Sequence, residues 1–413
     1  MIKKRELIWN TISSVISSLI SAVILAFCTR LNGVEIAGIF SICYATAYIL
    51  NAIGDFGLRI FQVTDTNREY NFSEYLCSRI VAVLLMSVAA IIFVWVNGYD
   101  FEKLTICLLL VLFRVVENLS ETYQAEFQIN GRLELGGKSI VYRNILGLFG
   151  VFIVDYLTRN IVLALLSMVV INVVIFSLYD LKIVKKFTET KLKVDRKNVI
   201  KILKGCLPLA ISTLISMYVI NAIKYAIDSS GDYEMQTYFN IIYMPTFVIN
   251  LISSFVLKPF LKPFGDAWNQ GNYKRFVKIV LSIIGVLVGA TIFVEIVCYM
   301  IGIPVLQLIY GVSLDMFKIH LLLLVLSGLL YAIANLFFNL LGTMRAQRTT
   351  TIVYAITAIF TLIIPKRIVN YYGMSGAVAS NILIMGILFT LMMFFFIIVY
   401  LKNLKKNKKE FDL

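Results

Sequence analysis

Long apolar runs separated by short polar segments fill almost the whole chain. A helix needs about 20 apolar residues to cross a hydrocarbon core of about 30 Å. Four of the runs, 104–125, 139–157, 276–299 and 350–370, carry charges but are still apolar enough to cross. The pattern therefore predicts an all-α, polytopic integral membrane protein with about twelve transmembrane helices. The other eight runs are free of charge: 7–29, 36–54, 80–99, 160–179, 205–223, 235–257, 319–344 and 368–401.

A repeat divides the chain into two halves. Residues 12–61 align without a gap on residues 211–260, at a constant offset of 199, with 14 identities in 50 positions. An even number of helices separates the copies, which predicts two parallel six-helix repeats around a central cavity, an arrangement typical of transporters. We expect an N-terminal six-helix bundle over 1–182, a basic linker over 183–204, a C-terminal six-helix bundle over 205–401 and a basic tail over 402–413.

Composition and charge support a position in the membrane. The chain is 60% hydrophobic and 15% charged, with a mean hydropathy of +0.86. Its net charge of +14 could suggest nucleic acid, but 30 of the 38 basic residues lie in alternate segments. This positive-inside pattern predicts a multi-pass cell-membrane protein with both termini, the linker and the tail in the cytoplasm, and contacts with anionic lipid. Nucleic acid is not an expected partner.

Several kinds of chemistry have no support in the sequence. The first helix lacks a small-residue cleavage site, so we expect it to be retained. His320 is the only histidine and the six cysteines are scattered through apolar segments, which predicts neither a metal site nor disulfides. No nucleotide-binding or hydrolase motif is present. We expect no enzyme activity and no cofactor.

Polar residues inside the predicted helices mark the interior of the protein. The first helix carries a serine stripe that includes Ser17, and the seventh carries Ser216, Asn221 and Lys224. Small hydroxyl residues also allow close helix packing, which is the simpler interpretation of the serines. Packing alone explains a buried lysine poorly.

The fourth predicted helix is the most polar. Arg114, Glu117, Asn118 and Glu121 fall within about 100° on one face. Arg114 lies about 15 Å below the outer end, where a charge costs about 2.5–3.5 kcal/mol on insertion scales. One interpretation is an internal ion pair of Arg114 with either glutamate. The other is an ion-coupling site, because one cation faces two carboxylates and leaves Glu117 or Glu121 spare.

A second charged pair lies near the inner end of the second predicted helix. Asp55 and Arg59 are four residues apart, so they can meet on one helix face. We expect them to form a structural pair at the membrane surface.

Four stretches of the chain carry a family resemblance: Gly38-Ile39-Phe40, Gly54-Asp55-Phe56-Gly57-Leu58-Arg59, Glu117-Asn118-Leu119-Ser120-Glu121 with Phe127-Gln128, and Trp268-Asn269-Gln270-Gly271-Asn272-Tyr273. They resemble the polysaccharide flippases of the multidrug/oligosaccharidyl-lipid/polysaccharide exporter superfamily, the Wzx-type repeat-unit transporters, and Gram-positive capsule members in particular. The similarity runs nearly from end to end.

The resemblance implies transfer of an undecaprenyl-pyrophosphate-linked oligosaccharide from the cytoplasmic to the outer leaflet by alternating access, with ion coupling. A sugar-pyrophosphate head cannot cross hydrocarbon with unsatisfied polar groups. We therefore expect Arg114 and Lys224 to neutralise phosphate. Hydroxyl groups of the cargo would be satisfied by Asn118, Asn221, Ser17 and Ser216.

Other functions stay open on the sequence alone. A multidrug exporter of the same superfamily is the nearest alternative, and a flippase for a teichoic acid or peptidoglycan precursor is another. A membrane-embedded polysaccharide polymerase would need a large outer loop, and the predicted outer loops are short. A polysaccharide polymerase or export machinery is an expected partner of the flippase.

Overall fold

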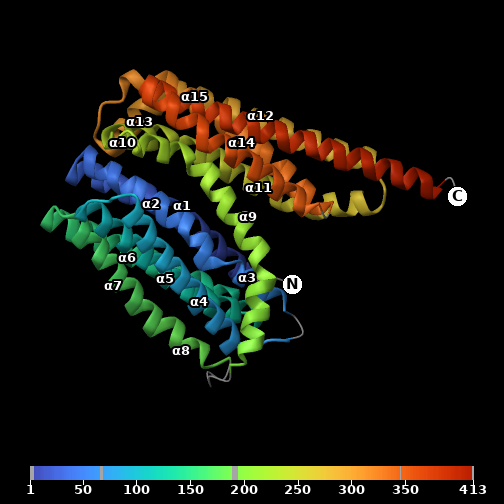
Figure 1. Ribbon diagram of the computed structural model, residues 1–413, viewed down its shortest axis with the longest axis horizontal. Helices are drawn as coiled ribbons and strands as arrows, with labels where there is room; N and C mark the ends of the chain where they lie inside the picture. The colour runs from blue at the N-terminus through green and yellow to red at the C-terminus, as the bar shows by residue number, and fades with distance from the viewer. Residues whose placement is uncertain (1–3, 66–67, 188–193, 345, 412–413) are drawn as a thin grey trace. The chain divides into compact units, whose positions relative to one another are not determined.

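The computed structural model describes residues 4–65, 68–187, 194–344 and 346–411, and its regular elements are helices (Figure 1). The elements are α1 Lys4–Asn32, α2 Val34–Asp55, α3 Leu58–Thr64, α4 Phe72–Val96, α5 Phe101–Ile129, α6 Leu133–Thr158, α7 Ile161–Ile175, η1 Phe176–Asp180, α8 Leu181–Val184, α9 Arg196–Asp228, α10 Tyr233–Tyr243, α11 Pro245–Asn269, α12 Tyr273–Val297, η2 Cys298–Gly302, α13 Ile303–Tyr310, η3 Asp315–Phe317, α14 Lys318–Thr343 and α15 Gln347–Phe411.

Ten helical stretches in the described residues are long and apolar enough to cross a membrane. Helix α5 is as long as the others but carries more charge, so it lies outside this group. Helix α15 counts once although Gly373, with φ 55° and ψ −130°, divides it into two helical segments. Adding α5 and counting both segments of α15 gives twelve. The prediction of an all-α polytopic membrane protein is confirmed.

The chain forms two compact units, Met1–Tyr218 and Val219–Leu413. In the first unit α5 packs against α2, α3, α4, α6 and α7, so it is the central helix. In the second unit α14 packs against α10, α11, α12 and α15. The expected position of the cavity between two bundles stays a prediction.

The first unit extends beyond the predicted linker. Helix α9 begins at Arg196, and its first turns place Ile202 and Cys206 in a cluster with Leu58, Tyr75 and Ala82. The second half of segment 183–204 is therefore helical and packed, while residues 188–193 lie outside the described part of the chain. The apolar side chains of α9 explain why the compact unit continues to Tyr218.

The two copies of the repeat keep the same helix register and then diverge. Helix α2 begins at Val34 and α10 begins at Tyr233, 199 residues later. Phe40 packs on Tyr44 with ring centroids 5.8 Å apart, and the equivalent rings of Phe239 and Tyr243 are 5.7 Å apart. The superposition of whole units stays a prediction.

The copies first differ after Tyr44 and Tyr243, because α2 continues to Asp55 whereas α10 ends at Tyr243. They differ again where α2 ends. Phe56 and Gly57 adopt left-handed conformations, with φ of 50° and 71°, and separate α2 from α3. The equivalent position of Gly57 is Val256, a residue that does not favour positive φ, and α11 continues through it. The left-handed break at Phe56 and Gly57 is thus a property of the first copy only, and it leaves carbonyl groups at the end of α2 without helical partners.

Helix α4 begins earlier than the apolar run predicted. Asn71 and Glu74 form a capping box, in which the Asn71 side chain accepts from the Glu74 amide at 3.0 Å and the Asn71 amide donates to Glu74 at 2.9 Å. The helix therefore starts at Phe72 instead of residue 80, and Arg79 lies two turns inside it. This shift brings an arginine into the core of the first unit.

Candidate functional site

Arg114 lies on α5 among rings and one carboxylate. Its Nη1 atom is 2.5 Å from Glu117 Oε2, and its Nη2 atom donates to the Tyr44 hydroxyl at 2.8 Å. The guanidinium carbon also lies 5.1 Å from the Tyr44 ring centroid, 5.5 Å from that of Tyr48 and 5.4 Å from that of Phe113. Aromatic faces and a carboxylate together compensate a desolvated cation.

Asn118 connects three helices one turn further along α5. Its Nδ2 atom donates to Asn51 Oδ1 on α2 at 2.7 Å and to the carbonyl of Arg114 at 2.8 Å. Its Oδ1 atom accepts from Nη1 of Arg79 on α4 at 3.0 Å. The side chain is buried and all three contacts lie within one unit, so Asn118 fixes α2, α4 and α5 relative to one another.

Arg79 is the residue that the sequence analysis missed. It is fully buried, and its Nη1 atom donates to the carbonyls of Gly54 and Asp55 at 2.9 Å each. Its Nε atom donates to Thr122 Oγ1 at 3.1 Å. The guanidinium therefore satisfies the carbonyls left open by the break after α2, the end of a helix where a cation is favoured.

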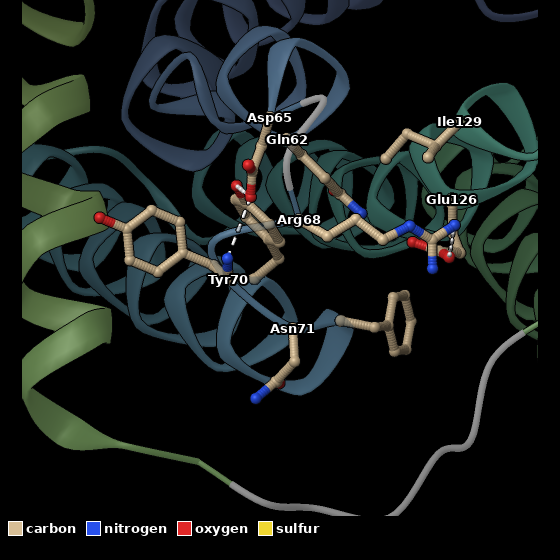
Figure 2. Close-up of a pocket in the computed structure, with 9 residues that line it drawn as sticks. Gln62, Asp65, Arg68, Tyr70, Asn71, Glu126 and Ile129 are labelled. Carbon is tan, nitrogen blue, oxygen red and sulfur yellow. Dashed lines mark hydrogen bonds and ion pairs between the residues drawn. The ribbon is translucent and has the colours of Figure 1, made fainter.

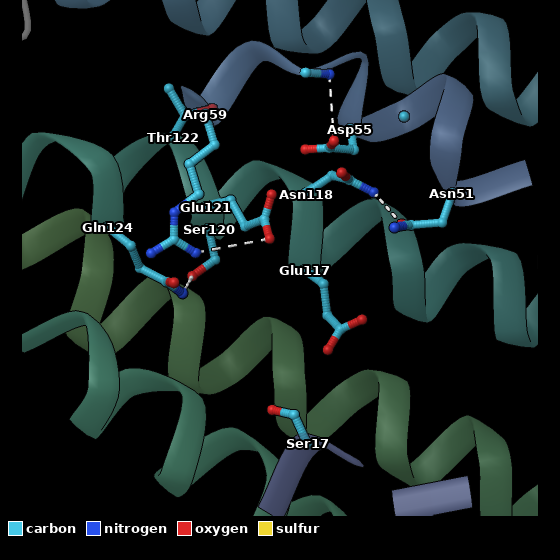
Figure 3. A network of polar contacts seen from close by, with 12 residues as sticks. Ser17, Asn51, Asp55, Arg59, Glu117, Asn118, Ser120, Glu121, Thr122 and Gln124 are labelled. Carbon is cyan, nitrogen blue, oxygen red and sulfur yellow. Dashed lines mark hydrogen bonds and ion pairs between the residues drawn. The ribbon is translucent and has the colours of Figure 1, made fainter. Parts of the chain in front are cut away.

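Carboxylates complete the network, and Figure 3 shows Asp55, Glu117 and Glu121 close to Arg59 and Asn118. Arg79 lies 3.6 Å from Asp55 Oδ1 and 3.6 Å from Glu121 Oε2, and Arg59 lies 3.9 Å from Glu121 Oε1. Three arginines thus face three carboxylates, so neither glutamate of α5 is spare. We call this set the α5 polar network: Arg59, Arg79, Arg114, Asp55, Glu117, Glu121, Asn51, Asn118, Thr122 and Tyr44.

The structure changes the partners of one predicted pair. Asp55 and Arg59 were expected to pair with each other, but their ion pairs are with Arg79 and Glu121. The left-handed turn at Phe56 and Gly57 interrupts the helix between them, so the four-residue spacing does not place them on one helix face.

The remaining predicted residues lie outside the network. Ser17 accepts a hydrogen bond from Asn144 of α6 at 3.0 Å, which joins α1 to α6 as the packing interpretation expects. Ser216 donates to the carbonyl of Thr213 in its own helix at 2.8 Å. Lys224 is half-buried and has no ion pair with any described residue. Asn221, which belongs to the second unit with Lys224, is buried.

A polar pocket of about 160 Å³ lies where α3 is connected to α4 (Figure 2). Asp65 accepts hydrogen bonds from the amides of Glu69 and Tyr70 and from the Tyr75 hydroxyl, at 2.9, 3.0 and 2.9 Å. Partial burial opposes ionisation of Asp65, but these three donors hold its pKa below the usual value. The pocket is lined by Gln62, Asp65, Arg68, Tyr70, Asn71, Phe72, Tyr75, Glu126 and Ile129.

The described residues contain no group of three metal-ligating side chains. No family model matches the chain. The chain is 24% identical over 376 residues to the capsular polysaccharide biosynthesis protein CapF of Staphylococcus aureus, covering 89% of this chain and 92% of that protein.

Solved structures with a similar fold are transporters and flippases. The lipid II flippase MurJ in an inward closed conformation matches with a TM-score of 0.68 and 12% identity, over 95% of this chain and 91% of that one. An inward-facing multidrug resistance MATE family transporter of the MOP superfamily matches at 0.67 and 13%, over 98% and 99%. The Vibrio cholerae MATE transporter VcmN in its bent form matches at 0.60 and 13%, over 96% of both chains.

These similarities show that the chain has the fold of MOP-superfamily membrane transporters. The resemblance to that superfamily, inferred from the sequence, is confirmed at this level. The matched structures are transporters and flippases, in agreement with the expectation that the chain is not an enzyme.

Proposed function

We propose that this protein is a flippase that moves undecaprenyl-pyrophosphate-linked polysaccharide repeat units from the cytoplasmic to the outer leaflet by alternating access. The observation that carries the proposal is the sequence match to a capsular polysaccharide biosynthesis protein over nearly the full length of both chains. The fold shared with a lipid II flippase supports a lipid-linked cargo. We further propose membrane lipid and a polysaccharide polymerase or export machinery as its partners.

Arg114 is the residue we propose to receive the pyrophosphate. Its side chain and that of Glu117 are 11% and 22% exposed, whereas the Arg79 side chain is fully buried. A phosphate offers the bidentate oxygen geometry that a guanidinium prefers, so it can replace Glu117 as the partner of Arg114. The Tyr44 and Tyr48 rings would hold the guanidinium in place during this exchange.

Glu117 then becomes the coupling group. A carboxylate displaced from Arg114 within an apolar unit would be costly if it stayed charged and without a partner, so it would take up a proton. Glu121 keeps Arg59 and Arg79 as partners when Glu117 is displaced. We propose Lys224 as a second phosphate-binding cation, with Asn118, Asn221, Ser17 and Ser216 as groups for the sugar hydroxyls.

The decisive experiment replaces the exchanging pair and leaves the rest of the network intact. In Arg114→Leu/Glu117→Leu, both charges disappear together, and replacing a complete buried pair is often neutral or stabilising. We expect normal membrane abundance and loss of surface polysaccharide in a deletion strain. Full complementation by this double variant would show that the pair is only structural.

Two single variants refine the assignment. Arg114→Lys keeps the charge but loses the bidentate geometry, so we expect partial complementation. Glu117→Gln keeps the shape of the side chain but cannot bind the proton, so it should impair coupling more than cargo binding. Lys318→Met serves as a control for loss of a cation, because Lys318 is at the start of α14 and contacts the ring of Tyr299.

A multidrug exporter is the second candidate, because the MATE family structure matches almost as well as the flippase. Cationic drugs would need a surplus of negative charge, and the α5 polar network has three cations against three carboxylates. Reconstituted protein separates the candidates: a fluorescent undecaprenyl-pyrophosphate oligosaccharide, a lipid II analogue and a cationic dye are offered in parallel. Movement of the dye alone would overturn the flippase proposal, and movement of the lipid II analogue alone would change its cargo.

A further inference from the structure

A second buried polar cluster lies in the first unit, outside the α5 polar network. Asp180 ends the π-helical segment η1, and it is fully buried. Its Oδ2 atom accepts from the hydroxyls of Ser120 on α5, at 2.7 Å, and Ser139 on α6, at 2.9 Å. Gln124 extends the cluster by donating to Ser120 Oγ at 2.9 Å. A carboxylate is therefore held at the junction of three helical segments, where π-helical turns often mark functional positions.

The cluster contains polar atoms with no hydrogen-bond partner among the described residues. The acceptors are Asp180 Oδ1 and Gln124 Oε1, and the donors are Nε and Nη1 of Arg143. Arg143 on α6 is only 3% exposed and interacts electrostatically with Asp180, yet no ion pair joins the two in the described part of the chain. Buried groups of this kind are normally satisfied by a hydrogen bond, because leaving them without a partner is costly.

The unpartnered atoms include both donors and acceptors, and this restricts the chemical class of ligand that can bind among them. A metal cation would be satisfied by the two acceptors but opposed by the Arg143 charge and its unpaired donors. An anion would be opposed by Asp180. Water both donates and accepts, and a buried water makes two to four hydrogen bonds, so water matches both the unpaired acceptors and the unpaired donors. A water next to a carboxylate can also deliver a proton to it.

We propose that Asp180, Gln124 and Arg143 enclose an internal water site, and that Asp180 is a proton-binding carboxylate whose charge changes during transport. The proton arrives on water and binds Asp180 Oδ1, which gives a neutral carboxyl group and leaves Arg143 as the uncompensated charge. Release reverses the step and returns the proton to water. Only the role in transport rests on the proposed flippase function.

The surroundings of Asp180 fit a carboxyl group that can be either ionised or protonated. The titratable side chains that face it are Arg143 from α6, Tyr123 from α5 and its neighbour Tyr179 in η1. Lys182 on α8 is exposed, and α7 holds no ionisable side chain. The two hydroxyl donors stabilise the ionised form, while burial favours the neutral form. Ser120 lies nine residues, about 14 Å, before the end of α5, and Ser139 lies six residues, about 9 Å, after the start of α6, so the cluster is within three helical turns of both ends.

A matched control exists on α6 itself. Asp155 is also fully buried, but both of its oxygens accept from Asn32 Nδ2 at 2.8 Å, and it has no orphan atom. Asp155→Asn therefore removes a buried carboxylate that has no water site. This variant tests whether the loss of any buried carboxylate in this unit changes the infrared band described below.

Infrared difference spectroscopy of the purified full chain during a pH titration tests the site directly. The wild type should show the C=O stretch of a protonated carboxyl group at low pH, and Asp180→Asn should lose that band while Asp155→Asn keeps it. If Asp180→Asn cannot be purified in folded form, Ser139→Ala assigns the band, because a carboxyl group that loses a hydroxyl donor changes its stretching frequency. A band unaffected by Asp180→Asn, or by Ser139→Ala in its place, overturns the proposal.

Transport measurements then test the role. In proteoliposomes with a fluorescent undecaprenyl-pyrophosphate oligosaccharide, a pH gradient should accelerate wild-type movement several-fold, and Asp180→Asn should lose this acceleration. If the wild type moves the cargo at the same rate with and without the pH gradient, the coupling role is overturned but the flippase function is not. A wild type that moves none of this cargo but retains the Asp180 band would overturn the proposed function and leave the proton site standing.

Discussion

Replacing Arg79 with methionine should be the most damaging single substitution in the first unit. The guanidinium of this fully buried residue donates to two carbonyls at the end of α2, to Asn118 and to Thr122. Methionine fills a similar space but donates nothing, so these acceptors stay buried without partners. Asp55 and Glu121 also lose a cation 3.6 Å away.

The size of the effect follows from these contacts. Removing one partner of a buried ion pair costs about 3–5 kcal/mol, and each orphaned buried acceptor costs about 1–3 kcal/mol. These terms are not added, because both describe the loss of one guanidinium from one site and the surrounding groups can relax together. We therefore expect Arg79→Met to lower the free energy of unfolding by about 3–5 kcal/mol. Arg79→Lys should be intermediate, because one ammonium group cannot reproduce the fork of donors.

Reversible unfolding in mixed detergent micelles, followed by tryptophan fluorescence, provides the measurement. Arg68→Met is the matched control, because the Arg68 side chain is 57% exposed and its ion pair with Glu126 is 3.9 Å long. Exposed pairs contribute about 0–1 kcal/mol. If Arg79→Met costs no more than Arg68→Met, the network does not depend on Arg79 and our account of the end of α2 is wrong.

Three further predictions concern the turn, the pocket and the topology. Gly57→Ala should destabilise the protein more than Gly98→Ala. At both positions φ is positive, which costs a non-glycine residue about 1–2 kcal/mol. At position 57, in addition, the new Cβ atom would lie 2.6 Å from a side-chain atom of Leu209, whereas position 98 is open. Chemical denaturation of the two variants compares them, and equal losses would refute the steric argument. Because the pKa of Asp65 is lower in the folded protein, its contribution to stability is present above the unfolded pKa of about 3.9 and is lost as pH falls through the folded pKa. Asp65→Asn should therefore reduce thermal stability at pH 7, with a difference from wild type that shrinks below pH about 4; a constant difference would contradict this assignment. On a cysteine-free background, Asn97→Cys should react with an impermeant reagent added outside and Lys186→Cys should not, and the opposite result would invert the topology.

The fold could be predicted from the sequence to a large extent, because the membrane imposes one strong rule. Every backbone group must be satisfied within the helix, so apolar length alone locates most spans. The start of α4 was misplaced because Phe72 to Cys77 includes Glu74, and the polar capping box was not counted as part of a span. Applying the capping signal to Asn71 and Glu74 would have corrected it.

The candidate site was predicted in part. Helical periodicity correctly gathered Arg114, Glu117, Asn118 and Glu121 on one helix, and the structure brings all of them into one network. The charge balance could not be predicted, because it depends on Arg79, which lies just before the predicted span 80–99 and so was not placed in a helix. Partners from separate helices depend on tertiary packing that periodicity does not contain.

The charge on α5 also has a consequence for the order in which the protein is made. An isolated helix with Arg114, Glu117 and Glu121 would enter the bilayer poorly, since each charge costs about 2.5–3.5 kcal/mol at the centre of a span. Arg114 and Glu117 pair within α5, whereas the cations that neutralise Glu121, Arg59 on α3 and Arg79 on α4, precede α5 in the chain. During synthesis these helices leave the ribosome before α5. If they remain near the translocon, α5 can insert by pairing with them instead of being exposed to lipid on all sides. Insertion of the central helix is thus a cooperative event, and damage to an earlier helix would appear as failed biogenesis of a later one.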